Sequence, residues 1–307
     1  MSFENFFGEA EFNYEAEKQK FIDNMDFLKE MSVQESVLWK KWEEFNKDPQ
    51  FFMDRADTID RLEKTIWQPT DIYNKELTIQ EINSIEPIVE PVEQGNAKAN
   101  EDWIITRRLI HSMEFTANPG RNVKMYIKDR VSGKMLGLVS LGSDVTSLGV
   151  RDNYIGWTKE NKFQDGRLNH TTIASTIVCT QPLGYNFLGG KLVACMTTSP
   201  VVREHWKEKY GQELIAVGTT SLYGIHSQYN GIPHFKTLGE SAGKVATKPD
   251  DSVYDVWHQW LKENEPDEYA RHTTQKDGIA GPVSGVKQRI LSMIFKELGI
   301  KQSHYMH

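Results

Sequence analysis

Residues 173–224 read IASTIVCT (173–180), QPLGYNFLGGKLVACM (181–196) and TTSPVVREHWKEKYGQELIAVGTTSLYG (197–224), and this stretch decides the fold. The first run is β-branched and apolar, which is typical of a buried strand, and Pro182 ends it because proline has no N–H to donate to a sheet. Apolar residues then recur at helical spacing and predict a helix over 186–198. A strand that ends in a glycine-rich turn and leads into a helix is the core of many α/β proteins.

The second half of the same stretch predicts another helix and another strand. Ser199 is a candidate N-cap, Pro200 suits the first helical position, and Gly211 follows the last helical residue. These signals place a helix over 200–210. The apolar run 214–220 then predicts a buried strand.

The glycine-rich turn is the first candidate binding site. Gly189 and Gly190 lie in the first turn of the predicted helix, where backbone N–H groups have no partner within the helix. Such a helix start attracts anions, and glycines let a phosphate come close. The alternative is that the two glycines only let the helix pack closely against a sheet. The turn is not a Walker loop, because Lys191 is followed by Leu192.

Composition excludes several classes of protein. The chain has 307 residues, of which 26% are charged and 38% hydrophobic, so it can bury one large core or two modest ones. No apolar run is long enough for a membrane span and the first residues are acidic, which predicts a cytoplasmic protein. Cys179 and Cys195 lie in apolar runs without metal-ligand spacing. We therefore expect buried free thiols and no metal.

The net charge of −7 is unevenly distributed. Residues 1–102 hold 11 Lys and Arg against 24 Asp and Glu, a balance of −13, whereas residues 103–250 hold 18 against 11, a balance of +7. A basic middle can face the phosphates of DNA, although the same balance also occurs on a solvated surface. The candidates for contact with nucleic acid are Arg107, Arg108, Arg151, Trp157 and Arg203.

Periodicity along the chain predicts three parts. Residues 1–86 form an acidic helical accessory region, with two or three amphipathic helices between Tyr14 and Trp67. Residues 87–248 form the α/β domain, and residues 249–307 a C-terminal helical extension. Thr78–Gln94 contains two prolines and no clear period, so we expect it to be an irregular crossing between parts.

Within the α/β domain, further elements are predicted before the glycine-rich turn. Residues 103–115 favour a helix or a strand, and 123–129 and 134–142 favour a strand hairpin that turns at Ser132-Gly133. Gly137 is a candidate for close approach of another element. A helix is expected to start near Asp165 and run toward His170.

Several motifs resemble one family. The sequence RDNYIGW (151–157), the run LGGKL (188–192), Trp206 and the later Tyr229 and Gly239 resemble the DruA-like family, which is found in phages and in the Druantia anti-phage system. The resemblance spans residues 87–244, and RDNYIGW is its most specific part.

A second resemblance concerns the fold and its ligand. The pattern Gln-x-x-Gly-x-x (181–186) is similar to the pyrophosphate loop of the GCN5-related acyltransferases, and the order of elements is similar to that of the Mom-type phage DNA-modification proteins. This implies an α/β fold with an acyltransferase-like mixed sheet flanked by helices and an N-terminal helical accessory segment. It also implies an acyl-CoA or CoA-like donor. The residues that would hold the donor are Gln181, Gly184, Asn186, Gly189, Gly190 and Lys191.

Three residues are candidates for proton transfer, each with a structural alternative. Asp152 is a candidate base, because a carboxylate among apolar rings has a raised pKa, but it can equally form an ion pair with Arg151. Tyr229 and Ser221 carry hydroxyl groups near the end of the last predicted strand, where ligands of α/β sheets gather, and either can instead make structural hydrogen bonds. Trp157 is a candidate for stacking a base or for the core.

Together, these resemblances imply a phage-type acyltransferase-like protein that transfers a small acyl or amide group to a DNA base. The alternative is a non-catalytic protein that keeps the fold and binds DNA or a partner. In either case the acidic N-terminal helices are candidates for docking a protein, and no membrane contact is expected.

Overall fold

A computed structural model describes residues 12–118, 120–180, 183, 189–221, 224, 227–240, 247–273 and 283–305, the last range without the side chains of 283–285. Contacts divide the chain into two compact units. The sheet unit is Val37–Ala242, and the helical unit combines Met1–Ser36 with Gly243–His307. The segment predicted as one accessory region is thus divided between both units.

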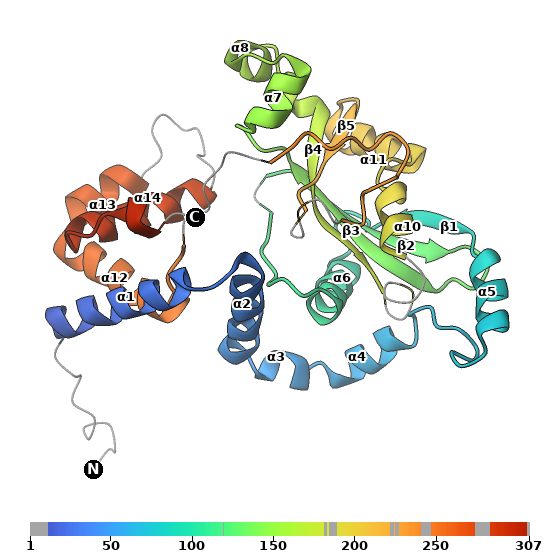
Figure 1. The fold of residues 1–307 in the computed structure, drawn as a ribbon, viewed down its shortest axis with the longest axis horizontal. Helices are drawn as coiled ribbons and strands as arrows, with labels where there is room; N and C mark the ends of the chain where they lie inside the picture. The colour runs from blue at the N-terminus through green and yellow to red at the C-terminus, as the bar shows by residue number, and fades with distance from the viewer. Residues whose placement is uncertain are drawn as a thin grey trace. The chain divides into compact units, whose positions relative to one another are not determined.

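The sheet unit is built on a mixed sheet of five strands in the order β1-β2-β3-β4-β5 (Figure 1). The strands are β1 (Pro87–Pro91), β2 (Asn122–Asp129), β3 (Met135–Ser143), β4 (Thr171–Cys179) and β5 (Ala216–Gly218). The pairs from β1 to β4 are antiparallel, and β4 pairs with β5 in parallel. A mixed α/β fold is therefore confirmed.

Strand β1 corrects the expectation of an irregular crossing. Its two prolines are the end residues Pro87 and Pro91, which pair with Asp129 and Met125 of β2. Because β1 is the edge strand, prolines at its ends need no hydrogen bond on the open side. The prolines hid a strand that only the pairing with β2 reveals.

The predicted hairpin is confirmed, and so is the close approach at Gly137. Alternate residues of β2 are buried, whereas β3 is buried on both faces. A Cβ on Gly137 would lie 2.5 Å from Val193 Cγ2 and 2.6 Å from Val178 O, so no larger residue fits without a shift. This glycine lets a helix lie directly on the sheet.

Helices cover both faces of the sheet (Figure 1). On one face, α10 (Gly189–Met196) and α11 (Pro200–Tyr210) contribute the buried side chains of Val193, Val202 and Trp206 to the main core. On the other face, α6 (Ala97–Ile110) packs Trp103, which donates from Nε1 to Met125 O at 3.1 Å. Residues 103–110 are thus helical, which resolves the choice between helix and strand.

The predictions for α11 and β5 are right in part. Pro200 begins α11, and Gly211 follows it with a φ of 72°. Ser199 is the N-cap residue, as predicted, with extended backbone angles, but its side chain makes no capping hydrogen bond to the helix. The predicted strand 214–220 is reduced to Ala216–Gly218, which is exposed or half-buried because it forms the second edge of the sheet.

The remaining helices of the sheet unit precede the sheet or connect its strands. They are α2 (Val33–Lys47), whose first residues belong to the other unit, α3 (Gln50–Met53), α4 (Ala56–Glu63), α5 (Lys75–Asn83), α7 (Gly149–Ile155), α8 (Lys159–Phe163) and the 3₁₀ helix η2 (Arg167–His170). The helix expected from near Asp165 toward His170 is the single 3₁₀ turn η2, and a separate short helix, α8, precedes it after a reciprocal Thr158–Asn161 capping box.

The helical unit has a core of its own. It contains α1 (Tyr14–Lys29), α12 (Asp251–Asn264), α13 (Pro266–Thr273), α14 (Val283–Glu297) and the 3₁₀ helix η3 (Gln302–Tyr305). Phe21, Trp257 and Ile294 are fully buried in it. Among the described residues of both units, we find no helix with the length and apolarity that crossing a membrane requires.

Candidate functional site

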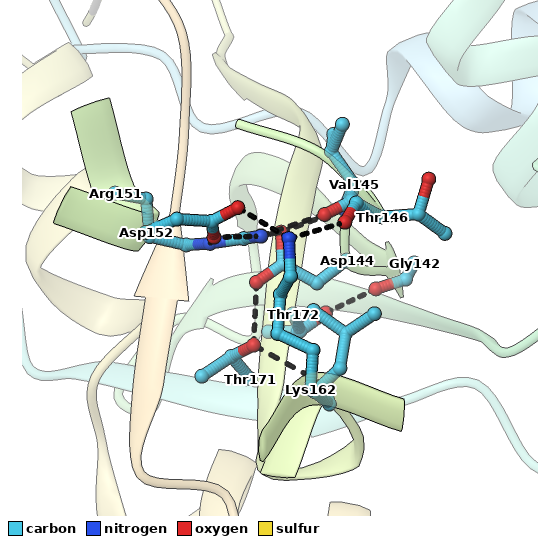
Figure 2. Close-up of polar contacts among 10 residues, drawn as sticks. Gly142, Asp144, Val145, Thr146, Arg151, Asp152, Lys162, Thr171 and Thr172 are labelled. Carbon is cyan, nitrogen blue, oxygen red and sulfur yellow. Dashed lines mark hydrogen bonds and ion pairs between the residues drawn. The ribbon is translucent and has the colours of Figure 1, made fainter. Parts of the chain in front are cut away.

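The first candidate site is a buried network of charged side chains on α7 and α8 (Figure 2). Arg151 binds two carboxylates: its Nη2 lies 2.7 Å from Asp152 Oδ1 and its Nη1 lies 2.7 Å from Asp144 Oδ1. Lys162 completes the network, with Nζ 2.5 Å from Asp152 Oδ2 and 3.1 Å from Thr146 O. Two cations thus face two carboxylates, and the four side chains neutralise one another.

Local structure brings these side chains together from four segments. Asp144 follows β3, α7 carries Arg151 and Asp152, and α8 carries Lys162. The first residue of β4, Thr171, donates from Oγ1 to Asp144 Oδ2 at 2.5 Å. The network therefore fixes α7 and α8 to the end of β3 and the start of β4.

The network corrects the expected pKa of Asp152. Burial raises the pKa of this carboxyl, but hydrogen bonds and charge from Lys162 and Arg151 lower it, and the net shift is downward. The prediction of a raised pKa is wrong, because the nearest groups are cations and not apolar rings. The geometry favours the ion-pair alternative, in which Asp152 stays ionised and positions its neighbours.

Trp157 belongs to the same region. Its ring is half-buried, and Arg151 Cζ lies 5.4 Å from the ring centroid. Its backbone N–H donates to Asp152 O at 2.8 Å, beyond Gly156, which has a left-handed φ of 78°. The RDNYIGW motif is thus a short helix, a left-handed glycine and a ring that packs on the preceding arginine.

The second candidate site lies where β4 and β5 part. Their parallel ladder has three pairs and ends at Ile173 opposite Gly218, although β4 runs on to Cys179. Beyond the ladder, backbone carbonyl oxygens of β4 accept hydrogen bonds from side chains instead of from a neighbouring strand. Thr219 Oγ1 donates to Ala174 O at 3.3 Å, and Gln228 Nε2 donates to Ile177 O at 3.1 Å.

Tyr229 lies at this point of separation. Its hydroxyl oxygen accepts from Gln228 Nε2 at 3.2 Å and lies 3.4 Å from Thr219 Oγ1. Its ring stacks on Phe235 at a centroid distance of 6.1 Å. Ser221 lies earlier in the chain, two residues after Thr219, and is half-buried. The two side chains that contact the Tyr229 hydroxyl reach β4 at Ala174 and Ile177, whereas the Asp152 network reaches the strand at Thr171, so these two candidates do not form one cluster.

The glycine-rich turn is described only at its end. Gln181, Gly184 and Asn186 lie outside the described residues. Gly189 and Gly190 are buried at the start of α10, where an added Cβ would collide with the side chains of Leu183 and Gln228 respectively. For these two glycines the geometry favours close packing over contact with an anion.

Lys191 has a partner within the protein. It lies in the first turn of α10 and donates from Nζ to Asn230 O. This contact attaches the helix to the segment that carries Tyr229.

Most of the arginines predicted to contact nucleic acid are engaged inside the protein. Arg107 is 5% exposed and donates to Met113 O at 2.6 Å and to Glu114 O at 3.0 Å. Arg108 is 9% exposed, pairs with Glu44 at 2.9 Å and stacks on Phe51. Arg151 is buried in the network described above. Only Arg203, on α11, is exposed among the four arginines.

Sequence reasoning missed Asp144, Lys162, Thr219 and Gln228. No local signal marks them, because each acts on a residue that is distant in sequence or lies across a turn. A hollow of about 760 Å³ between α4, α5 and the β2–β3 hairpin is lined by none of the predicted site residues. Among the described residues, no group of His, Cys, Asp and Glu has the geometry of a metal site.

Comparison with known proteins defines the class. The family model described as Druantia protein DruA matches residues 49–307, and this range includes the sheet, the charged network and the β4–β5 separation. The chain therefore belongs to the DruA family, as the sequence motifs predicted.

A curated relative has the same description. The Druantia protein DruA of Escherichia coli (strain UMEA 4076-1) is 29% identical over 199 residues, which are 59% of this chain and 48% of that protein. The match thus spans about half the length of the relative. No solved structure matches the fold.

Proposed function

We propose that this protein is an acyltransferase-like enzyme that transfers a small acyl or amide group from a CoA-like donor to a base in DNA. One observation carries the proposal: the parallel pair of β4 and β5 parts after three residue pairs, and the Tyr229 hydroxyl lies in the opening beside β4. Two parallel strands that splay apart, with a helix between them in the sequence, are the arrangement expected for a GCN5-type fold that binds a CoA-like ligand.

The residues divide into two roles under this proposal. Tyr229 is the catalytic candidate, because its hydroxyl lies where the strands open and is oriented by Gln228 and Thr219. It would donate a proton to the departing thiolate of the donor. Asp152 is a positioning residue, since its two cations hold it ionised within a buried network.

A specific observation favours the alternative of a non-catalytic binding protein. Gln228 occupies the space above Gly190 and satisfies Ile177 O, where the open edge of β4 would otherwise offer a carbonyl to a ligand. A donor would have to displace this side chain. If Gln228 keeps this position in the working protein, its side chain fills the opening between β4 and β5 and no donor binds there.

Mass spectrometry of nucleosides tests the proposal. DNA from cells that express the full chain is compared with DNA from cells that express Tyr229→Phe, which keeps the ring and its stacking on Phe235 but removes the hydroxyl. We expect a modified nucleoside with the wild type and at least a hundredfold less of it with the variant, within the range for loss of an acid–base group.

A matched control is Tyr269→Phe, which removes a hydroxyl from the helical unit where it bonds His258. This variant should modify DNA as the wild type does. If the wild type leaves all nucleosides unchanged while the protein binds DNA, the enzyme proposal is refuted and the binding alternative stands.

A further inference from the structure

The sheet unit has a group of cations that the protein does not neutralise. Lys124 lies on β2, Lys209 on the last turn of α11, and Arg121 just before β2. Within the described part of the chain, none of the three forms an ion pair with Asp or Glu. We call these three side chains the β2–α11 patch.

The contacts of the patch are all with neutral groups. Lys124 Nζ donates to Asn100 Oδ1 at 2.6 Å, and Lys209 Nζ donates to Asn122 O at 2.9 Å. Arg121 Nη1 donates to Asn169 O at 3.0 Å. Each cation is therefore held in place by an oxygen that carries no formal charge.

Other lysines on the same strand and the same helix do form ion pairs with carboxylates. On the same strand, Lys128 pairs with Glu90 at 2.5 Å, and on the same helix Lys207 pairs with Glu213. Within the residues that the structure describes, carboxylates thus pair with these adjacent lysines but not with Lys124 or Lys209. The patch keeps a positive charge that an external anion can neutralise.

The two lysines also oppose each other. Partial burial lowers the pKa of both, and the charge of Lys209 lowers the pKa of Lys124 further. Holding two half-buried cations near each other costs stability unless an anion binds between them. A bound anion would stabilise the charged form of both lysines.

Aromatic rings lie behind the cations. Arg121 Cζ is 5.1 Å from the Tyr210 ring centroid, and Lys124 Nζ is 5.3 Å from that of Trp103. These rings limit the freedom of the side chains and orient their charged ends. Arg121 and Lys124 lie on either side of Asn122 in the sequence, and Lys209 bonds to the carbonyl oxygen of Asn122, so the three cations gather at the start of β2, where they can contact phosphates of one chain.

We propose that the β2–α11 patch binds the phosphate backbone of a nucleic acid strand. The inference rests on the proposed function only for its choice of DNA, since the surrounding residues 103–250 carry a balance of +7 (18 Lys and Arg against 11 Asp and Glu). Three of the arginines predicted from the sequence to contact nucleic acid are buried. The β2–α11 patch is proposed in their place, because its positive charges are not neutralised by the described residues.

Binding of a labelled DNA duplex, measured by fluorescence anisotropy over a series of salt concentrations, tests the patch. The full chain is compared with Lys124→Gln/Lys209→Gln. If each lysine contacts one phosphate, the slope of log K against log salt falls by about two units, and the affinity falls roughly 60-fold at 0.1 M salt. Because both lysines are unfavourably placed, the variant should unfold at the same temperature as the wild type or higher.

Two further variants separate charge from structure. Lys124→Arg/Lys209→Arg keeps the charge and should keep the salt slope. Lys75→Gln/Lys301→Gln removes the same charge from two exposed lysines outside the patch and should bind nearly as the wild type does.

Three results would overturn the inference: no DNA binding by the wild type, equal loss in both Gln variants, or binding only to vesicles that contain phosphatidylserine. Nucleoside mass spectrometry reports the proposed reaction separately. DNA binding through the patch without a modified nucleoside would refute only the proposed reaction. A modified nucleoside without DNA binding through the patch would refute only this inference.

Discussion

Replacing Asp152 with alanine should destabilise the sheet unit strongly. Asp152 is 8% exposed and is bound by Lys162, which is also 8% exposed, and by Arg151. After the substitution, Arg151 keeps Asp144, but Lys162 keeps only the carbonyl oxygen of Thr146. A buried ion pair that loses one partner leaves an uncompensated charge, which costs about 3–5 kcal/mol.

The expected loss corresponds to a fall of roughly 6–20 °C in the midpoint of thermal unfolding of a domain of this size. Denaturation by urea at neutral pH, followed by tryptophan fluorescence, measures the change directly, since Trp157 packs on Arg151. The control is Asp165→Ala, which removes a carboxylate whose contact with Arg167 is exposed. That change should alter the free energy of unfolding by less than about 1 kcal/mol.

A double variant makes the reasoning refutable. Asp152→Ala/Lys162→Met removes one charge of each sign and leaves the pair of Arg151 and Asp144, so it should regain most of the stability lost by Asp152→Ala. If Asp152→Ala behaves like the exposed control, or if the double variant is no more stable than the single one, the network does not stabilise the fold as argued.

Three other predictions follow from the described contacts. The pKa of Asp152 is lowered in the fold, so its stabilisation is complete above about pH 4, the usual pKa of an unfolded Asp, and disappears as the pH falls through the lower folded value; acid titration of unfolding should show that the wild type loses its advantage over Asp152→Asn there. Gly137→Ala should cost about 1–3 kcal/mol in urea denaturation, and Val193→Ala should relieve only part of it, because the backbone oxygen of Val178 cannot withdraw. Burial, with the charges of Arg107 and Lys41, lowers the pKa of His111 to about 3, so NMR should find its ring neutral at pH 5, where a histidine with the usual pKa is mostly protonated.

The confirmed predictions of secondary structure are those that depend only on residues close together in the sequence. Alternation identified β2, and Pro200 and Gly211 marked the ends of α11, because these patterns depend only on local geometry. The family motif RDNYIGW was also visible, although its physical role was not. The need for glycine at Gly137 was evident before the element that packs on it was known.

Tertiary structure decided which charges are free. Arg107, Arg108 and Arg151 look like surface cations in the sequence, yet each is buried against partners from other segments. Lys124 and Lys209 looked ordinary, yet Lys209 bonds to the strand that carries Lys124, and neither pairs with a carboxylate among the described residues. Pairing depends on distances between residues that are far apart in the chain, and so does the sign of the shift in the pKa of Asp152.

The same reason explains the two ends of the sheet. Residues 87–91 became a strand because β2 offered an edge where prolines are tolerated, and residues 214–220 formed only a short strand because β4 pairs with just three of them. Local sequence determined which segments can extend or coil. The neighbours that fill or leave open a hydrogen-bonding edge determined how far each strand continues and where Tyr229 lies.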